Sequence, residues 1–128
     1  MGVLALLKKK LLKGFFFNVL KNRFGDENVE IYHTSFKPLE WNFLKTRETN
    51  SCYIKVITNM TENYRVHGIH YVGPNAGEVV QGYAVGMLKG LTLEDLNETI
   101  GIHPTCSEEI LGLTITKREQ ENAEKTGC

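Results

Sequence analysis

The chain has 128 residues, and its 15 lysines and arginines balance its 15 aspartates and glutamates. A hydrophobic content of 41% suits a single globular domain with a core and excludes a disordered or collagen-like chain. Neither of the glycine-rich phosphate-binding motifs, G-x-G-x-x-G or G-x-x-x-x-G-K-[ST], occurs in the sequence, so nucleotide or redox chemistry would need another domain or another chain.

Basic residues are concentrated at the start of the chain. Residues 1–23 hold six of them and no acid, which leaves 9 basic against 15 acidic residues, a net charge of −6, for the rest. No nucleic-acid partner is expected, because such a partner needs basic residues on the folded face. Residues 1–22 are predicted to form a separate basic segment, since lysines after Leu7 break the apolar run of a secretory signal. We interpret it as a frayed, solvated helix; the alternative is a basic amphipathic helix lying on an anionic membrane.

Three strands are predicted after Gly25. Alternating residues predict one strand at 29–34, and apolar runs predict two more at 52–58 and 65–72. Residues 60–63, between the last two, are typical of a hairpin turn. We therefore expect antiparallel strands that follow one another in the sheet.

A long helix is predicted to begin after Pro74. Asn75 is expected to cap its first turn, and Glu78 to reach back in a capping-box-like arrangement. Gly90 is expected to end the helix in a left-handed conformation.

Two glycines inside this helix, Gly82 and Gly86, lie one turn apart. They either form a smooth stripe for close contact with another element or have no consequence. Two short helices are predicted next, one capped by Thr92 and reaching Asn97, and one from Ser107 to Leu113.

Together these elements predict an α+β domain at residues 23–116, with an antiparallel sheet of three to four strands, one long helix and two short ones. Residues 117–128 show no apolar periodicity and are expected to form a mobile tail.

Three of the four histidines lie in predicted strands. His67 and His70 are three positions apart, so we expect them on opposite faces, where they cannot share a metal ion. Together with His33, which has no evident partner, they are interpreted as packing residues, and no metal site is predicted.

His103 differs because it precedes Pro104 in an irregular segment, where an extended backbone can project the ring outward. Glu108 or Glu109 could hold one ring nitrogen and raise the proton affinity of the other. Such a base suits thiol–disulfide exchange. The alternative is that Thr105 and Glu108 are only the capping box of the last helix.

The three cysteines have different expected environments. Cys52 begins a predicted strand and is expected to be buried, Cys106 lies beside the His103 segment, and Cys128 is expected to be an exposed thiol. There is no C-x-x-C motif, so a partner for Cys128 is expected to be missing or to come from another chain.

Several segments resemble the C-terminal interface domain of the pyridine nucleotide-disulfide oxidoreductases. They are GIHPTCSEE at 101–109 (the active-site segment), GPNAGE at 73–78 with QGYA at 81–84 (the main helix), and Tyr32–His33 with PLEW at 38–41 (the first long strand and its loop). Lys117–Arg118 and the ending Thr126-Gly127-Cys128 are similar to the large thioredoxin reductases and thioredoxin-glutathione reductases, which end in Gly-Cys-selenocysteine-Gly.

The resemblance implies the dimerisation domain of an NADPH-dependent thioredoxin or thioredoxin-glutathione disulfide reductase. It implies that His103, oriented by Glu108, is the acid–base for the cysteine pair of the other subunit, and that His103 and Pro104 lie near its flavin. Cys128 would pair with selenocysteine and pass electrons to thioredoxin. The implied partner is a second copy or a full-length reductase subunit, and no membrane partner is expected.

The family's FAD and NADPH domains match nothing in this sequence. FAD and NADP are thus implied for the full-length enzyme, whereas this chain is expected to bind neither and to be inactive alone. We expect it to stop where a selenocysteine codon was read as a stop. The expected compartment is the cytoplasm, with the mitochondrion as the alternative. Rival interpretations are a non-catalytic dimerisation and interaction module, and a thiol scavenger that acts through Cys128.

Overall fold

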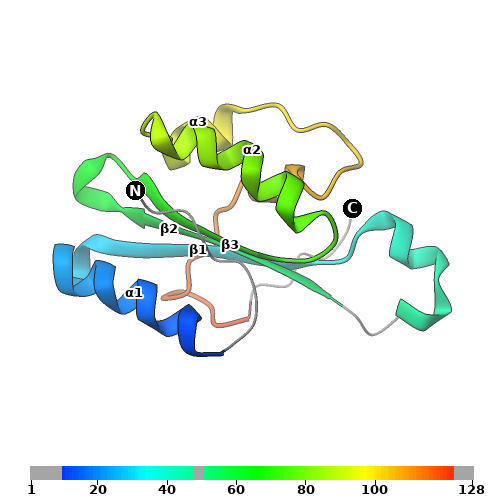
Figure 1. The fold of residues 1–128 in the computed structure, drawn as a ribbon, viewed down its shortest axis with the longest axis horizontal. Coiled ribbons are helices and arrows are strands. Elements are labelled where there is room, and N and C mark those ends of the chain that lie inside the picture. Colours follow the sequence, from blue (N-terminus) through cyan, green and yellow to red (C-terminus); the bar gives the residue numbers. More distant parts are fainter. Residues whose placement is uncertain (1–9, 48–50, 123–128) are drawn as a thin grey trace.

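The computed structural model describes residues 10–47 and 51–122. In this part of the chain an antiparallel sheet lies between helices on its two faces (Figure 1). The strands are β1 (Val29–Phe36), β2 (Cys52–Asn59) and β3 (Arg65–Val72), and the helices are α1 (Lys10–Phe24), α2 (Ala76–Leu88) and α3 (Leu93–Glu98). The predicted α+β class and the three successive strands are confirmed.

The sheet has the strand order β1-β2-β3, because each strand pairs with the next one along the chain. The turn at Met60–Glu62 is stabilised by Asn59, whose side chain accepts a hydrogen bond from the Thr61 amide at 3.1 Å. Asn63 then adopts a left-handed conformation, φ 53°, which returns the chain into β3. The hairpin turn predicted at 60–63 is therefore confirmed.

A β-bulge changes the alternation of β3. Ile57 pairs with Gly68 but Thr58 pairs with Val66, so His67 is an extra residue on β3. The His67 ring consequently lies 5.0 Å from the ring of Phe24 in α1.

His70 lies on that same face, because it follows Gly68 by two positions and Gly68 pairs with Ile57, which packs against α1. The expectation that His67 and His70 point to opposite faces is wrong, since the bulge interrupts the two-residue period.

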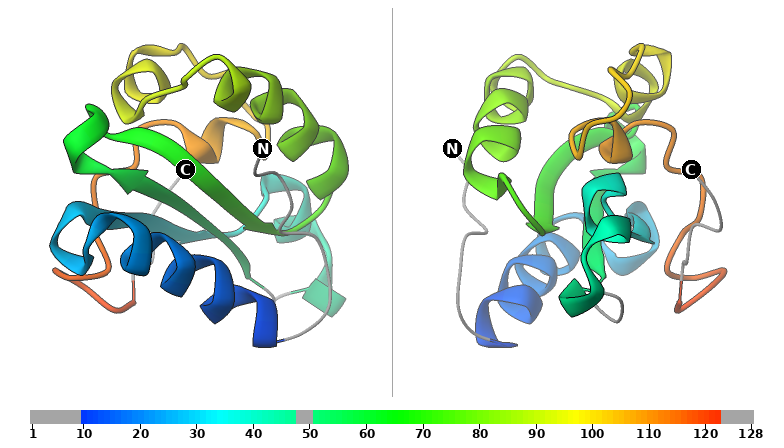
Figure 2. Two further views of the ribbon diagram at one scale, coloured as in Figure 1. Left: turned by 60° about the vertical axis from the view of Figure 1, so that its left-hand side comes forward. Right: turned by 90° about the vertical axis from the view of Figure 1, so that its right-hand side faces the viewer.

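Each face of the sheet has its own apolar cluster, and Figure 2 shows α1 on one side of the sheet and α2 and α3 on the other. The smaller cluster lies under α1 and the larger one under α2, α3 and the segment around Ile110. The smaller cluster consists of Leu20, Val29, Ile31 and Ile57, with Phe17 and Phe24 beside it. The larger one includes Ile54, Val56, Ile69, Tyr71, Val80, Leu96 and Ile110.

Helix α1 runs across residue 22, where the basic segment was expected to end. Leu20 is buried in the smaller cluster. The interpretation of a frayed, solvated helix therefore does not hold for residues 17–22, whose apolar side packs on the sheet, whereas residues 1–9 lie outside the described residues. In the described ranges, no helix is both long and apolar enough to cross a bilayer.

Helix α2 begins differently from the prediction. Asn75 has a left-handed backbone, φ 55°, and its side chain makes no capping bond. A capping side chain needs an extended backbone to reach the first-turn amides, so the left-handed conformation excludes the expected cap. Gly90 does adopt the predicted left-handed conformation after the helix, with φ 93°.

The two predicted short helices have different outcomes. Helix α3 is capped by Thr92 in a reciprocal capping box with Asp95, which confirms the cap. The helix expected from Ser107 to Leu113 is only a single 3-10 turn, Glu108–Ile110. It ends early because the chain is extended at Leu111 and left-handed at Gly112, φ 68°.

The segment after Leu113 returns to the outer edge of β1. Tyr32 and Thr116 form an isolated antiparallel bridge, and Arg65 of β3 forms another with Thr92, so single bridges stand where a fourth strand was expected among the described residues. The Lys117 amide donates to the Ile31 carbonyl at 2.9 Å, and the Gln120 carbonyl contacts the His33 ring at 2.8 Å. The tail expected to be mobile from residue 117 is thus attached to β1 as far as Gln120.

Candidate functional site

His103 lies in the irregular segment between α3 and the 3-10 turn at Glu108–Ile110. Its Nδ1 is 3.0 Å from Oε1 of Glu108, and its side chain is 64% exposed. The His103–Pro104 peptide bond is cis. Because the carboxylate oxygen can only accept, Nδ1 carries the hydrogen and Nε2 is the nitrogen that can take up a proton.

Glu108 itself is fixed by the backbone. The same Oε1 accepts a hydrogen bond from the Thr105 amide at 3.0 Å, and the Glu108 amide donates to Oγ1 of Thr105 at 3.2 Å. The capping box and the orienting carboxylate, alternatives in the sequence, are therefore present together in one side chain. Of the two candidates, Glu108 is the one whose carboxylate contacts the His103 ring.

Tyr83 and Gly101, for which no individual role was predicted, shape this segment. The Tyr83 hydroxyl of α2 donates to the Ser107 carbonyl at 3.0 Å. A Cβ atom on Gly101 would be 2.9 Å from Cβ of Glu108, so the chain can pass over Glu108 only with glycine there. A glycine two positions before His103 was the only sequence signal for this close approach.

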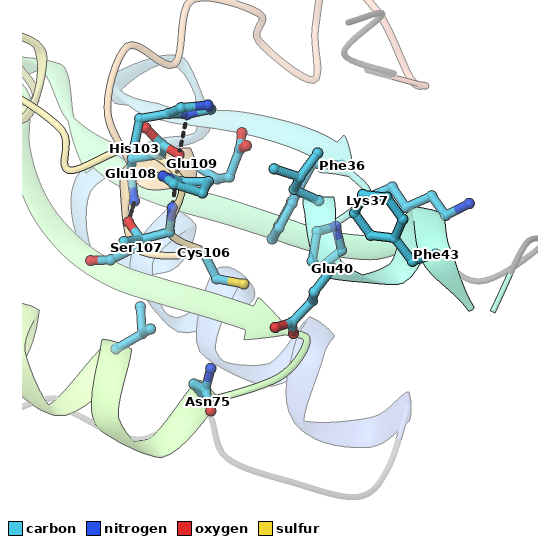
Figure 3. Close-up of a pocket in the computed structure, with 15 residues that line it drawn as sticks. Phe36, Lys37, Glu40, Phe43, Asn75, His103, Cys106, Ser107, Glu108 and Glu109 are labelled. Carbon is cyan, nitrogen blue, oxygen red and sulfur yellow. Dashed lines mark hydrogen bonds and ion pairs between the residues drawn. The ribbon is translucent and has the colours of Figure 1, made fainter. Parts of the chain in front are cut away.

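A cavity of about 530 Å³ lies beside His103 (Figure 3). One wall is the segment that contains His103, Cys106 and Glu109. The opposite wall is the chain after β1, with Glu40 and Phe43. Two of the stretches that carry the family resemblance, PLEW at 38–41 through its first three residues and HPTCSEE at 103–109, thus meet at one cavity.

Cys106 is half-buried at this cavity, while Cys52 is fully buried, as expected. Burial raises the pKa of the nearby Tyr71 hydroxyl far above its usual range, and the hydrogen-bonded Cys106 adds to this. Tyr71 therefore stays protonated and donates to the Pro74 carbonyl at 2.8 Å. Cys128, the third expected site residue, lies outside the described residues.

The other histidines also have partners. His33 is 1% exposed, and its Nδ1 is 3.0 Å from the Tyr53 hydroxyl. The expectation that His33 has no partner is therefore wrong. Its second partner, Gln120, is 87 positions away in sequence, so no local pattern could have predicted it. His67 lies 2.5 Å from a carboxylate oxygen of Glu62. No group of three or more metal-ligating side chains is assembled within residues 10–47 and 51–122.

Comparison with known proteins decides the family. The family sequence model described as "Pyridine nucleotide-disulphide oxidoreductase, dimerisation domain" matches residues 18–113. The chain belongs to this family. The resemblance drawn from the His103 segment and the α2 sequence is thus confirmed at the level of the dimerisation domain.

A relative of this dimerisation domain is Thioredoxin reductase SEP1 of Emiliania huxleyi. It is 50% identical over 104 residues, which cover 81% of the present chain and 21% of the relative. The dimerisation domain therefore spans about a fifth of the length of that protein.

FAD and NADP are implied for full-length members of the family, but the cavity of this dimerisation domain does not fit them. Glu40, Glu108 and Glu109 all line it, and these carboxylates disfavour a pyrophosphate group. The sequence also lacks the glycine-rich turns that bind such groups. The described residues that line this cavity therefore do not form a dinucleotide site.

Proposed function

We propose that this chain is the dimerisation domain of an NADPH-dependent thioredoxin or thioredoxin-glutathione disulfide reductase. Its role is to present His103 and Glu108 to a dithiol of a second subunit and to contribute Cys128 as a redox cysteine. The observation that carries the proposal is the exposed His103 ring, held at Nδ1 by Glu108 with Nε2 directed away from that carboxylate. The match to a protein named thioredoxin reductase supports the reaction class.

The chemistry follows from the protonation of the ring. When a thiol of the second subunit attacks a disulfide, its proton moves to Nε2 of His103, and the attacking sulfur forms a new bond as the old S–S bond breaks. The leaving thiolate then takes the proton back from Nε2. Glu108 favours this transfer because its negative charge stabilises the imidazolium form.

The partner is a second copy of the chain or a full-length reductase subunit, with thioredoxin as the disulfide substrate. FAD and NADPH would be bound by the other domains of such an enzyme. The rival function is a non-catalytic interaction module. It is favoured by apolar side chains exposed on α2 and on the segment after α3, which are Val85, Leu88, Ile100 and Ile102.

The test uses a chimeric reductase in which this chain replaces the matching 104 residues of the Emiliania huxleyi relative. We expect NADPH-dependent disulfide reduction by the chimera. His103→Asn should lower kcat by about 100-fold or more, because loss of a general acid–base costs roughly that much.

The matched control is His67→Asn. His67 and His103 are each paired with a carboxylate five positions away, but His67 does not line the cavity. The control should keep kcat within about threefold, since distant surface changes are nearly neutral. Equal activity of the His103 variant and the unchanged chimera would contradict the catalytic role and leave the interaction module.

A further inference from the structure

The C-terminal segment 113–120 is held against β1 by backbone hydrogen bonds and by side chains at two points. Beyond the Lys117 amide bond to Ile31, the His33 amide donates to the Ile115 carbonyl at 3.0 Å. The Gln120 amide donates to the Thr116 carbonyl at 3.1 Å, which closes a turn. The segment is therefore a short edge addition to the sheet and ends in a turn at Gln120.

Arg118 holds the segment at the start of β1. Its guanidinium donates to the carbonyls of Asp26 and Val29, and its Nε lies 3.2 Å from Oε2 of Glu30. The Arg118 side chain is 49% exposed, and ion pairs in contact with water contribute little to stability. Arg118 is thus the weaker of the two attachments.

His33 holds the segment at its other end from a buried position. Its Nε2 is 2.8 Å from the Gln120 carbonyl, which can only accept, so Nε2 carries the hydrogen. Nδ1 of the neutral ring then accepts from the Tyr53 hydroxyl at 3.0 Å. Burial raises the pKa of Tyr53, so this hydroxyl stays protonated and remains a donor. We name His33, Tyr53 and Gln120 together the His33 anchor.

The His33 ring is 1% exposed, whereas Tyr53 is half-buried and Gln120 is exposed. Without the ring, the Gln120 carbonyl and the Tyr53 hydroxyl would each lose a part-buried hydrogen-bond partner, and residues 118–120 would keep only the solvent-exposed Arg118 contacts. Loss of the anchor therefore opens the segment back toward residue 117, where the next backbone bond to β1 lies.

We propose that His33 is a positioning residue that fixes Gln120 against β1 and thereby sets the point from which the following residues, Cys128 among them, extend along the sequence. Cys128 follows Gln120 by eight positions, so its reach from the anchor is at most about 28 Å. If the chain were attached to β1 only as far as residue 117, the possible reach of Cys128 would increase by about 10 Å. The local concentration of its thiol at the target would then fall. The effect on turnover rests on the proposed function of Cys128; the anchoring itself does not.

The test compares two substitutions of His33 in the full 128-residue chain. The Gln amide nitrogen occupies nearly the place of Nε2 and can donate to the Gln120 carbonyl, whereas the Asn amide lies near Nδ1 and cannot reach it. Hydrogen exchange is measured at the Gln120 amide, with the Lys117 amide, which keeps its bond to Ile31, as a reference. We expect at least about tenfold faster exchange of the Gln120 amide in His33→Asn and no more than about threefold in His33→Gln, with Lys117 and Ile57 on β2 unchanged.

Two outcomes would overturn the anchor. One is unchanged protection of Gln120 in His33→Asn. The other is faster exchange across β2 and β3 to the same extent, which would make His33 an ordinary core residue.

A second measurement separates this inference from the proposed function. In the active chimera, His33→Asn should raise KM for the protein disulfide or lower kcat by about fivefold or more, and His33→Gln should restore it. A catalytically silent chimera together with the expected exchange pattern would refute the proposed function and leave the anchor intact. Unchanged turnover in an active chimera would refute the positioning role.

Discussion

Two histidine–carboxylate pairs of this domain share a spacing but differ in what their carboxylates contact. Glu108 is held by the Thr105 backbone and carries an exposed ring at the cavity wall. Glu62 lies in the hairpin turn, and its ring partner His67 packs against Phe24. The first pair leaves a ring nitrogen available to another molecule, whereas the second ties a turn to α1. Spacing alone therefore does not identify a site; the position of the ring decides it.

The second pair gives a prediction on pH. The hydrogen bond from His67 is the largest cause that lowers the pKa of Glu62 from its ordinary 4.5. A depressed carboxyl pKa contributes stability above pH 4.5, and this contribution is lost as pH falls through the folded value. We expect an NMR titration of the Glu62 carboxyl to have its midpoint below 4.5, and His67→Phe to move it back toward that value. A midpoint that His67→Phe leaves unchanged would assign the shift to other neighbours.

Several elements whose signals are local were predicted, although the Asn75 cap was not, whereas features that depend on distant partners were missed. The strand at 65–72 and the Thr92 cap agree with the structure because apolar runs and capping depend on neighbouring residues. The bulge at His67 depends on the register with β2, and the His33 bond depends on a residue 87 positions away. Neither feature can be predicted from the periodicity of neighbouring residues.

The candidate site likewise has one part that follows from local sequence and one part that does not. His103 and Glu108 are five positions apart, so their pairing could be expected from the sequence. The opposite wall of the cavity, with Glu40 and Phe43, comes from the chain after β1. Only the folded sheet brings that wall to His103.

Helix α1 is part of the packed domain, and this gives a prediction at the scale of one element. Leu20 is 5% exposed in the smaller cluster, whereas its neighbour Val19 is 42% exposed. Leu20→Ala should lower the free energy of unfolding by about 2–4 kcal/mol through a lost apolar contact and a cavity. Val19→Ala should change it by less than about 0.5 kcal/mol. Urea denaturation measures both, and equal stability of the two variants would mean that α1 does not pack on the sheet in solution.

At the scale of the whole molecule, the sheet separates two clusters, and the outer side of α2 is left open. The two glycines inside α2, Gly82 and Gly86, have different surroundings. A Cβ on Gly86 would contact Leu91 of the same chain at 3.5 Å, whereas one on Gly82 would meet nothing within 4 Å. Gly82 also borders a second cavity with Glu78 and Tyr83. Of the two glycines inside the helix, Gly82 is thus the one that leaves room for a second molecule.

Gly82→Ala tests this open surface. In a single chain, the substitution should raise the free energy of unfolding by up to about 1 kcal/mol, because alanine favours a helix over glycine. If a second copy packs closely on α2, the same methyl group should weaken self-association by about fivefold or more, as measured by sedimentation velocity.

The matched control is Gly90→Ala. It should lower stability by about 1 kcal/mol, because φ at Gly90 is 93°. Association of Gly82→Ala that equals that of the unchanged chain would place the contact between copies elsewhere.

The shared oxygen of Glu108 has one more consequence. Oε1 accepts hydrogen bonds from both the Thr105 amide and the His103 ring, so one atom holds the loop backbone and the imidazole together. The orientation of the ring is therefore fixed relative to the loop that carries it. The His103 ring can in this way keep a fixed orientation while it stays exposed to solvent, and it remains accessible to the surface of another molecule.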